Sequence, residues 1–200
     1  MRAVKIILWG GVGVALAGFL WFSLWHVRGS GGGGPSQDTA ATFRPTFSLT
    51  DHRGNAVTEQ SYRGKWLTVF LGFTNCPDIC PMTLAELARV MERLGPDAGS
   101  VKPLFVSIDP ERDWAESMAE YVSAFHPAIV GLTGTEAQIA EAARSLKAYY
   151  EKQPQASAPD GYTMGHTSAV YLISPKGEFV RTYSYGTPPG EIAEDLQKRL

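Results

Sequence analysis

Cys76 and Cys80 are the only two cysteines of the chain, and three residues separate them. An apolar stretch over residues 66–73 predicts a buried strand before the pair, and residues 82–94 after it have the apolar spacing of a helix. At such a junction the sulfurs lie near a helix N-terminus, where the helix dipole favours a thiolate over a thiol. Thiolates placed there can exchange disulfides or hold a soft metal ion, and the spacing leaves both chemistries open.

A histidine supplies the best third donor for a metal. His166 directly precedes residues 168–173, a predicted strand, and follows a proline-containing loop predicted over residues 153–161. In a thioredoxin-like sheet the loop before this strand approaches the helix that carries the cysteines, so we expect His166 to lie near both sulfurs. The chain has four histidines, and the other three are interpreted as surface or boundary residues: His26, His52 and His126.

Two thiolates and one imidazole form a soft, three-donor set. This set suits copper as Cu(I), with Cu(II) as a second form, whereas a structural zinc site more usually has four protein ligands. Met82 and Met164 are thioethers close in sequence to the three donors, but gap-filling in the core is the simpler interpretation of both. Asp78 is interpreted as a solvated loop carboxylate, and Asp109 as a structural residue that ends a buried strand.

The segments around these residues predict the fold. Further strands are predicted over residues 104–108 and 129–132, hairpins over 47–58 and 168–183, and helices over 113–125, 135–150 and 189–200. Asp113, with Glu116 three residues later, predicts a capped helix N-terminus. Helices that alternate with buried strands, with hairpins at both ends, predict an α/β sandwich with a mixed, centrally parallel sheet. A cysteine pair between the first buried strand and its helix is where a thioredoxin-like fold carries its active site, so we expect a fold of that type.

The N-terminal segment predicts a transmembrane helix. Residues 6–25 contain no charged residue, and at about 1.5 Å per residue they span roughly 30 Å, the thickness of a bilayer's hydrocarbon core. The run exceeds the ~7–15 apolar residues of a signal peptide, so an uncleaved anchor is favoured. We therefore expect an anchor over residues 1–28, a Gly-rich flexible linker over 29–39 and a thioredoxin-like copper-binding domain over 40–200.

The composition of the chain limits which partners and which cellular location are expected. The 18 basic and 20 acidic residues give a net charge of −2, and no basic stripe interleaved with aromatic residues predicts binding to nucleic acid. The N-terminal segment lacks the Arg- and Ser-rich character of a mitochondrial transit peptide. The predicted location is a bacterial cytoplasmic membrane, crossed once, with the soluble domain facing the periplasm.

Three segments resemble the Sco/SenC family of membrane-anchored copper chaperones. They are GFTNCPDICP at residues 72–81, SIDPERD at 107–113 and GHT at 165–167, in the family's order and at about its spacing. The resemblance extends from Phe43 onward and implies a thioredoxin-like fold with Cys76, Cys80 and His166 as copper ligands. It also implies a role in maturing the binuclear copper (CuA) centre of cytochrome c oxidase subunit II.

One position departs from the family pattern. Many relatives have an aspartate directly before the histidine, where this chain has Gly165. A carboxylate there can orient the imidazole. Its absence is expected to weaken or retune Cu(II) binding while leaving all three ligands in place.

Two functions remain open. The favoured one is a copper chaperone, which is not an enzyme in the turnover sense, with subunit II of cytochrome c oxidase and another copper chaperone or thiol-disulfide oxidoreductase as partners. The alternative is a membrane-anchored thiol-disulfide oxidoreductase, in which Cys76 attacks a partner disulfide and Cys80 resolves the mixed disulfide. Metal binding requires His166, and disulfide exchange does not. A thiol peroxidase is disfavoured because no arginine lies close in sequence to the cysteines.

Overall fold

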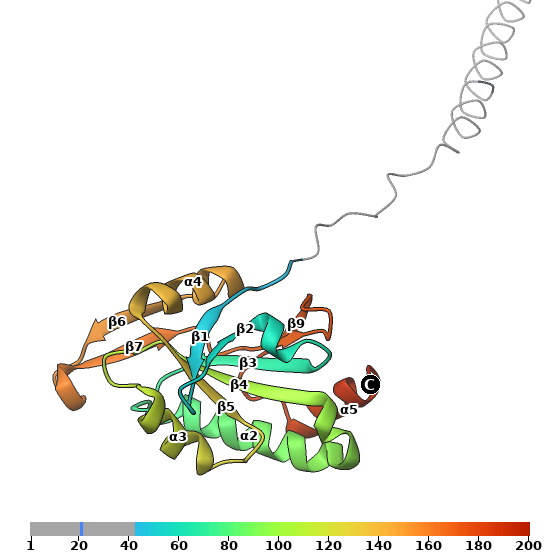
Figure 1. Cartoon of the computed structure of the whole chain (residues 1–200), viewed down its shortest axis with the longest axis horizontal. Helices are drawn as coiled ribbons and strands as arrows, with labels where there is room; N and C mark the ends of the chain where they lie inside the picture. Colours follow the sequence, from blue (N-terminus) through green and yellow to red (C-terminus); the bar gives the residue numbers. More distant parts are fainter. Residues whose placement is uncertain (1–20, 22–42) are drawn as a thin grey trace, which may run out of the picture. The chain divides into compact units, whose positions relative to one another are not determined.

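The structure is a computed structural model that describes Trp21 and residues 43–200. Most strands of residues 43–200 belong to one seven-stranded sheet with the order β2-β1-β5-β4-β3-β8-β9, and β6 and β7 form a separate two-stranded hairpin (Figure 1). The pairs β3–β4 and β4–β5 are parallel, and the other pairs in the sheet are antiparallel. The predicted mixed, centrally parallel sheet is confirmed.

The strands are β1 Ser48–Asp51, β2 Ala56–Thr58, β3 Trp66–Gly72, β4 Val101–Ser107, β5 Val130–Thr133, β6 Tyr150–Pro154, β7 Tyr162–His166, β8 Val170–Ile173 and β9 Phe179–Tyr183. The α-helices are α2 Ile79–Leu94, α3 Ala115–Ser123, α4 Glu136–Leu146 and α5 Pro189–Gln197, and the short 3₁₀ helices are η1 Glu59–Tyr62, η2 Gly95–Ser100 and η3 Pro159–Gly161.

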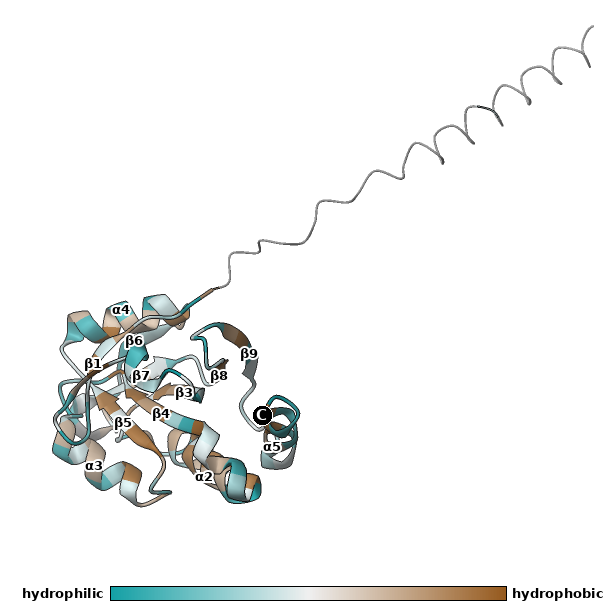
Figure 2. Ribbon diagram, turned by 45° about the vertical axis from the view of Figure 1, so that its right-hand side comes forward, coloured by the Kyte–Doolittle hydropathy of each residue, from teal (hydrophilic) through white to brown (hydrophobic). Residues whose placement is uncertain are grey.

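The helices cover the sheet from both sides. Helix α4 lies on one face, and α2, α3 and α5 lie on the other (Figures 1 and 2). Strands β3 and β4 are therefore buried almost throughout, which explains their near-continuous apolar sequences. Phe70, Phe105 and Leu104 are among the fully buried side chains of this core.

The carboxyl ends of β3 and β4 meet at one edge of the sheet. Their register pairs Gly72 with Ser107, and the Ile108 amide donates to the Gly72 carbonyl at 2.9 Å. The segment that follows β3 carries both cysteines, and the segment that follows β4 carries Asp109 and its neighbours. The parallel pairing thus brings two of the sequence motifs side by side.

Two helix boundaries differ from prediction. Helix α3 begins at Ala115 with Trp114 as its N-cap, so the predicted cap at Asp113 is wrong; that side chain is buried and bonded elsewhere. Helix α4 ends at Leu146 rather than near residue 150, because Lys147 adopts the left-handed conformation at φ 54° and stops it.

The loop predicted over residues 153–161 is also partly wrong. Residues 150–154 form β6, which pairs antiparallel with β7 and sets Tyr150 opposite His166. The side chains of β6 are mostly exposed, so the strand lacks the apolar alternation by which a strand is recognised. The hairpin projects from the same end of the domain as the ends of β3 and β4 (Figure 1).

The predicted anchor and linker, residues 1–28 and 29–39, lie outside the described residues except for Trp21. Among the residues that the structure does describe, no helix has both the length and the apolar character needed to cross a bilayer.

Candidate metal centre

The turn between β3 and α2 fixes the two sulfurs relative to each other. The Cys76 amide donates to the Phe73 carbonyl at 3.3 Å, which folds the loop back over the end of β3. The Cys80 amide, in the first turn of α2, donates to Cys76 Sγ at 3.4 Å. Cys76 is half-buried and Cys80 is fully buried. A sulfur that accepts from the first turn of a helix is placed where negative charge is favoured.

His166 completes the cluster from the far end of β7. Its Nε2 lies 3.6 Å from Cys80 Sγ, and its Nδ1 lies 3.0 Å from the Thr167 carbonyl oxygen. A carbonyl only accepts, so Nδ1 must carry the proton, which leaves the Nε2 lone pair directed at the sulfurs. The two sulfurs and one imidazole nitrogen all lie within 4.8 Å of one another.

Aromatic rings and a glycine enclose this cluster. The Phe70 and Phe73 rings form T-shaped pairs with the imidazole, with centroids 5.9 and 6.0 Å away. A Cβ at Gly72 would lie 2.7 Å from Cys80 Sγ and 2.7 Å from the Phe105 ring. Only glycine therefore lets the end of β3 approach the buried sulfur this closely.

The two cysteines have opposite protonation preferences. The hydrogen bond from the Cys80 thiol lowers the pKa of Cys76, and bonds from backbone amides lower it further. The same hydrogen bond between the two side chains raises the pKa of Cys80, and the burial of Cys80 raises it further. In the metal-free, reduced site these opposite pKa shifts favour a thiolate at Cys76 and a thiol at Cys80. A metal that binds both sulfurs must displace the Cys80 proton.

Asp113 holds the cysteine loop from below. Its carboxylate accepts from the Thr74 amide at 3.0 Å, the Thr74 hydroxyl at 2.5 Å and the Ser107 hydroxyl at 2.6 Å. The side chain is only 1% exposed, and burial raises its pKa despite these donors. The sequence analysis interpreted this residue as a helix cap. Its position shortly after a buried strand could have indicated that it lies beside the cysteine motif, which follows the neighbouring strand.

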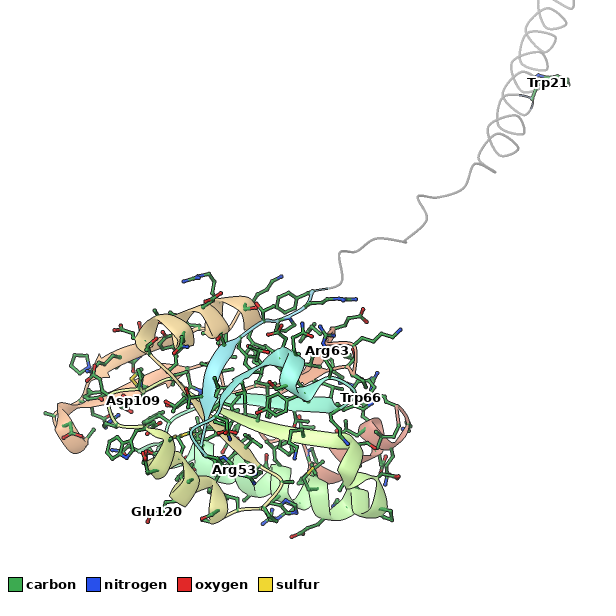
Figure 3. All side chains as sticks on the ribbon, in the orientation of Figure 1. Trp21, Arg53, Arg63, Trp66, Asp109 and Glu120 are labelled. Carbon is green, nitrogen blue, oxygen red and sulfur yellow. The ribbon has the colours of Figure 1, made fainter. Side chains whose placement is uncertain are left out.

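The remaining residues considered from sequence have structural contacts. Asp109 accepts from Arg112 Nε at 2.5 Å and from the Tyr162 hydroxyl at 2.9 Å, as its predicted structural role requires. Figure 3 shows Asp109 near the base of the β6–β7 hairpin, at the opposite end of the sheet from Trp66. Met164 is buried in the core, as predicted, whereas Met82 is 48% exposed.

Two of the other histidines also have local partners. His52 Nδ1 accepts from the Gly131 amide at 3.0 Å, and His126 Nδ1 accepts from the Ala128 amide at 3.1 Å. Both bonds are to backbone groups, so both residues have the structural roles expected of them. His26 lies outside the described residues.

Comparison with known proteins finds relatives that match the whole domain. The family model described as SCO1/SenC matches residues 35–200. The SCO2 homolog of Bos taurus is 41% identical over 163 residues, which are 80% of this chain and 61% of that protein. The chain therefore spans about three fifths of the length of the curated relatives that it matches first.

Solved structures agree with this match. The copper-bound structure of Bradyrhizobium japonicum ScoI has a TM-score of 0.73 and 40% identity, and the match covers 79% of this chain and 99% of that one. A structure of BsSco, described with a disulfide switch and as a member of the Sco family of cytochrome c oxidase assembly proteins, has a TM-score of 0.62 and 25% identity over 80% of this chain and 95% of that one. The predicted thioredoxin-like fold is confirmed by this likeness.

The comparisons correct the predicted location. The curated relatives from Bos taurus and Homo sapiens are named as mitochondrial proteins, so the prediction of a bacterial cytoplasmic membrane with a periplasmic domain is wrong. That prediction was based on the composition of the first residues, which lack the character of a transit peptide. The comparisons instead match the domain over residues 35–200. On the family model and these relatives together, the chain belongs to the SCO1/SenC family.

Proposed function

We propose that this chain is a copper chaperone whose cargo is held by Cys76, Cys80 and His166. The observation that carries the proposal is the convergence of their three donor atoms within 4.8 Å. Two sulfurs and one imidazole nitrogen match the preference of Cu(I) for soft ligands, and the imidazole also accommodates Cu(II). Copper-bound structures of the relatives from Bradyrhizobium japonicum and Arabidopsis thaliana support copper as the cargo.

Release of the cargo follows from the unequal exposure of the ligands. Cys80 is fully buried, whereas Cys76 is half-exposed at the head of α2. An incoming thiolate or imidazole therefore reaches the metal on the side of Cys76, and exchange of that ligand starts the transfer. The Cys80 proton that left on loading returns when the metal departs.

The proposed recipient is the CuA centre of cytochrome c oxidase subunit II. The Sco family is described as a family of cytochrome c oxidase assembly proteins, which supports delivery to this enzyme. Another copper chaperone or a thiol-disulfide oxidoreductase would supply the metal or keep the thiols reduced. We further propose that residues 1–28 anchor the chain in a membrane, with residues 29–39 as a tether and 40–200 as the copper-binding domain; the charge-free run over residues 6–25 supports this organisation.

The same thiols could instead exchange disulfides, but the geometry supports this function less well. Disulfide exchange makes no use of His166, yet the imidazole is directed at the sulfurs by its bond to the Thr167 carbonyl and by two aromatic rings. Because these contacts orient a third donor that disulfide exchange does not need, they favour metal binding.

Anaerobic copper titration of the reduced full-length chain in detergent tests the proposal. We expect one-to-one binding, with thiolate-to-Cu(II) charge-transfer absorption in the oxidised form. The His166→Ala variant should lose that absorption and bind Cu(II) about tenfold or more weakly, while its two thiolates keep most of the Cu(I) affinity. His126→Ala, which removes a histidine with only a local backbone contact, is the matched control and should bind like the wild type. Weak binding that is indifferent to His166 would reject the copper site and favour disulfide exchange.

A further inference from the structure

A buried ion pair lies beside the metal centre, in the segment that follows β4. Arg112 Nε donates to Asp109 Oδ2 at 2.5 Å, and the two side chains are only 10% and 3% exposed. The Asp109 amide is fixed in turn by the Ser107 hydroxyl at 3.0 Å. The pair is thus anchored to the carboxyl end of a central strand.

Tyr162, the first residue of β7, is attached to this pair in three ways. Its hydroxyl donates to Asp109 Oδ1 at 2.9 Å. Its ring lies against the Arg112 guanidinium, with 3.8 Å between the central carbon and the ring centroid. Its carbonyl accepts from Arg112 Nη1 at 3.5 Å. A planar guanidinium can make a carboxylate contact and an aromatic contact together, which a lysine ammonium cannot match.

The attachment of Tyr162 bears on the third donor of the site. Tyr162 begins β7 and His166 ends it, and β7 is paired with β6 along its whole length. A displacement at the start of this short, paired strand is therefore passed to its end. The Arg112 guanidinium also lies 5.8 Å from the Phe73 ring centroid, and that ring forms a T-shaped pair with the imidazole.

Asp113, the residue after Arg112, is hydrogen-bonded to the loop that carries the other two donor residues, Cys76 and Cys80. Asp113 accepts both the amide and the hydroxyl of Thr74, in the loop that leads to Cys76. Residues 109–113 therefore contact the hairpin that carries the imidazole and the loop that carries the thiolates. This one segment sets the position of each half of the site relative to the other.

We propose that Asp109, Arg112 and Tyr162 form a latch that positions His166 against the cysteines, with Arg112 as its central positioning residue. The inference deepens the proposed copper function and rests on it. Two thiolates alone retain Cu(I), whereas Cu(II) depends on the imidazole nitrogen. Opening the latch should therefore weaken Cu(II) binding much more than Cu(I) binding.

Arg112→Met in the full-length chain tests the latch. We expect at least about a tenfold loss of Cu(II) affinity, with a shifted charge-transfer band, and less than about a threefold change in Cu(I) affinity. Arg112→Lys should not restore the wild-type Cu(II) spectrum, because lysine lacks the planar fork. Tyr162→Phe, which keeps the ring and removes only the hydroxyl, should give a smaller change in the same direction.

Arg199→Met is the matched control, since it removes an arginine just after α5 that contacts a carboxylate through two nitrogens and lies away from the hairpin. Its Cu(II) spectrum should be that of the wild type. Equal Cu(II) spectra and affinities for Arg112→Met and Arg199→Met would overturn the proposal. If Arg112→Met fails to fold by circular dichroism, Tyr162→Phe decides, and an unchanged Cu(II) spectrum in that variant rejects the latch.

Hydrogen–deuterium exchange in the metal-free chain separates this inference from the proposed function. The amides of β7 should exchange faster in Arg112→Met than in Arg199→Met, and equal rates would overturn the latch. A wild-type chain that binds no copper would reject the copper function itself, and the exchange rates would still decide whether the latch holds His166 in place.

Discussion

At the scale of single residues, the two cysteines differ in what they can do. Cys76 is half-buried at the head of a helix and has a lowered pKa, whereas Cys80 is fully buried and has a raised pKa. Cys76 is therefore the sulfur that solvent and partners can reach, and Cys80 is shielded from both. This asymmetry has a direct chemical readout.

Iodoacetamide should modify Cys76 before Cys80 in the reduced, metal-free chain. Because the pKa of Cys76 is lowered, its thiolate persists as the pH falls from 8 to 6, and its rate should fall far less than that of an ordinary thiol with a pKa of about 8.5. Mass spectrometry of peptides after timed quenching measures both sites. Earlier modification of Cys80, or a steep loss of Cys76 labelling over this range, would contradict the assignment.

Gly165 offers a second prediction at this scale. A Cβ there would lie 2.7 Å from Gln153 Nε2, the far end of an exposed, flexible side chain that can move aside. Gly165→Asp should therefore fold with a change in stability below about 1 kcal/mol and place a carboxylate next to His166. We expect tighter Cu(II) binding, measured by competition.

Gly165→Asn, with the same size and no charge, is the control for that substitution. It should leave the Cu(II) affinity near the wild-type value. If both variants bind Cu(II) equally well, the carboxylate charge is not the cause of any gain.

At the scale of elements, the predictability of each segment follows its burial. Strands β3 and β4 are buried on both faces, so their near-continuous apolar sequences predicted them correctly. Strand β6 has an exposed surface and no such pattern, so it was missed. The convergence of Cys76, Cys80 and His166 could be predicted because their residue types are chemically distinctive. The support from Asp113 and Arg112 could not, because it depends on tertiary contacts 39 residues or more along the chain from Thr74 and Tyr162.

The hydrogen bonds that connect the end of β4 to the cysteine loop depend on Asp113, so one substitution removes them. Asp113→Ala leaves three donors, from Thr74 and Ser107, without their acceptor in a buried site. An unsatisfied buried group costs about 1–3 kcal/mol, so the free energy of unfolding should fall by at least about 2 kcal/mol in urea denaturation. Ser123→Ala, whose hydroxyl bonds only locally on the exposed end of α3, should cost less than about 0.5 kcal/mol.

The docking of α5 gives the stability a dependence on pH. Burial raises the pKa of Asp195, but hydrogen bonds from Arg199 and Tyr183 and the charge of Arg181 lower it overall. A depressed carboxyl pKa contributes stability above the unfolded value of about 3.9, and this contribution is lost as the pH falls through the lower folded value. Asp195→Asn should therefore be less stable than the wild type at pH 7 by about 1–2 kcal/mol, with a difference that narrows below about pH 4. A difference that is constant from pH 7 to 3 would contradict this account.

At the scale of the whole molecule, copper binding and folding are linked. The donors come from the start of α2 and the end of β7, and they converge only when the hairpin is docked. A ligand that binds only the folded state stabilises it by about 2.7 kcal/mol when its free concentration is 100 times its dissociation constant. Anaerobic loading with Cu(I) should thus raise the melting temperature, and the rise should be smaller for His166→Ala.

The distance along the chain between the donors has a consequence for how the protein is made. Cys80 and His166 are 86 residues apart in sequence, and the segment that aligns them, residues 109–113, lies between them. A ribosome that has released only the first half of the domain has presented both thiols but not yet His166. A chain cut before β7 is in the same condition. The three donors can therefore converge only in a chain that has been made and folded at least through β7, so a test of copper binding also reports on synthesis and folding of the domain up to that strand.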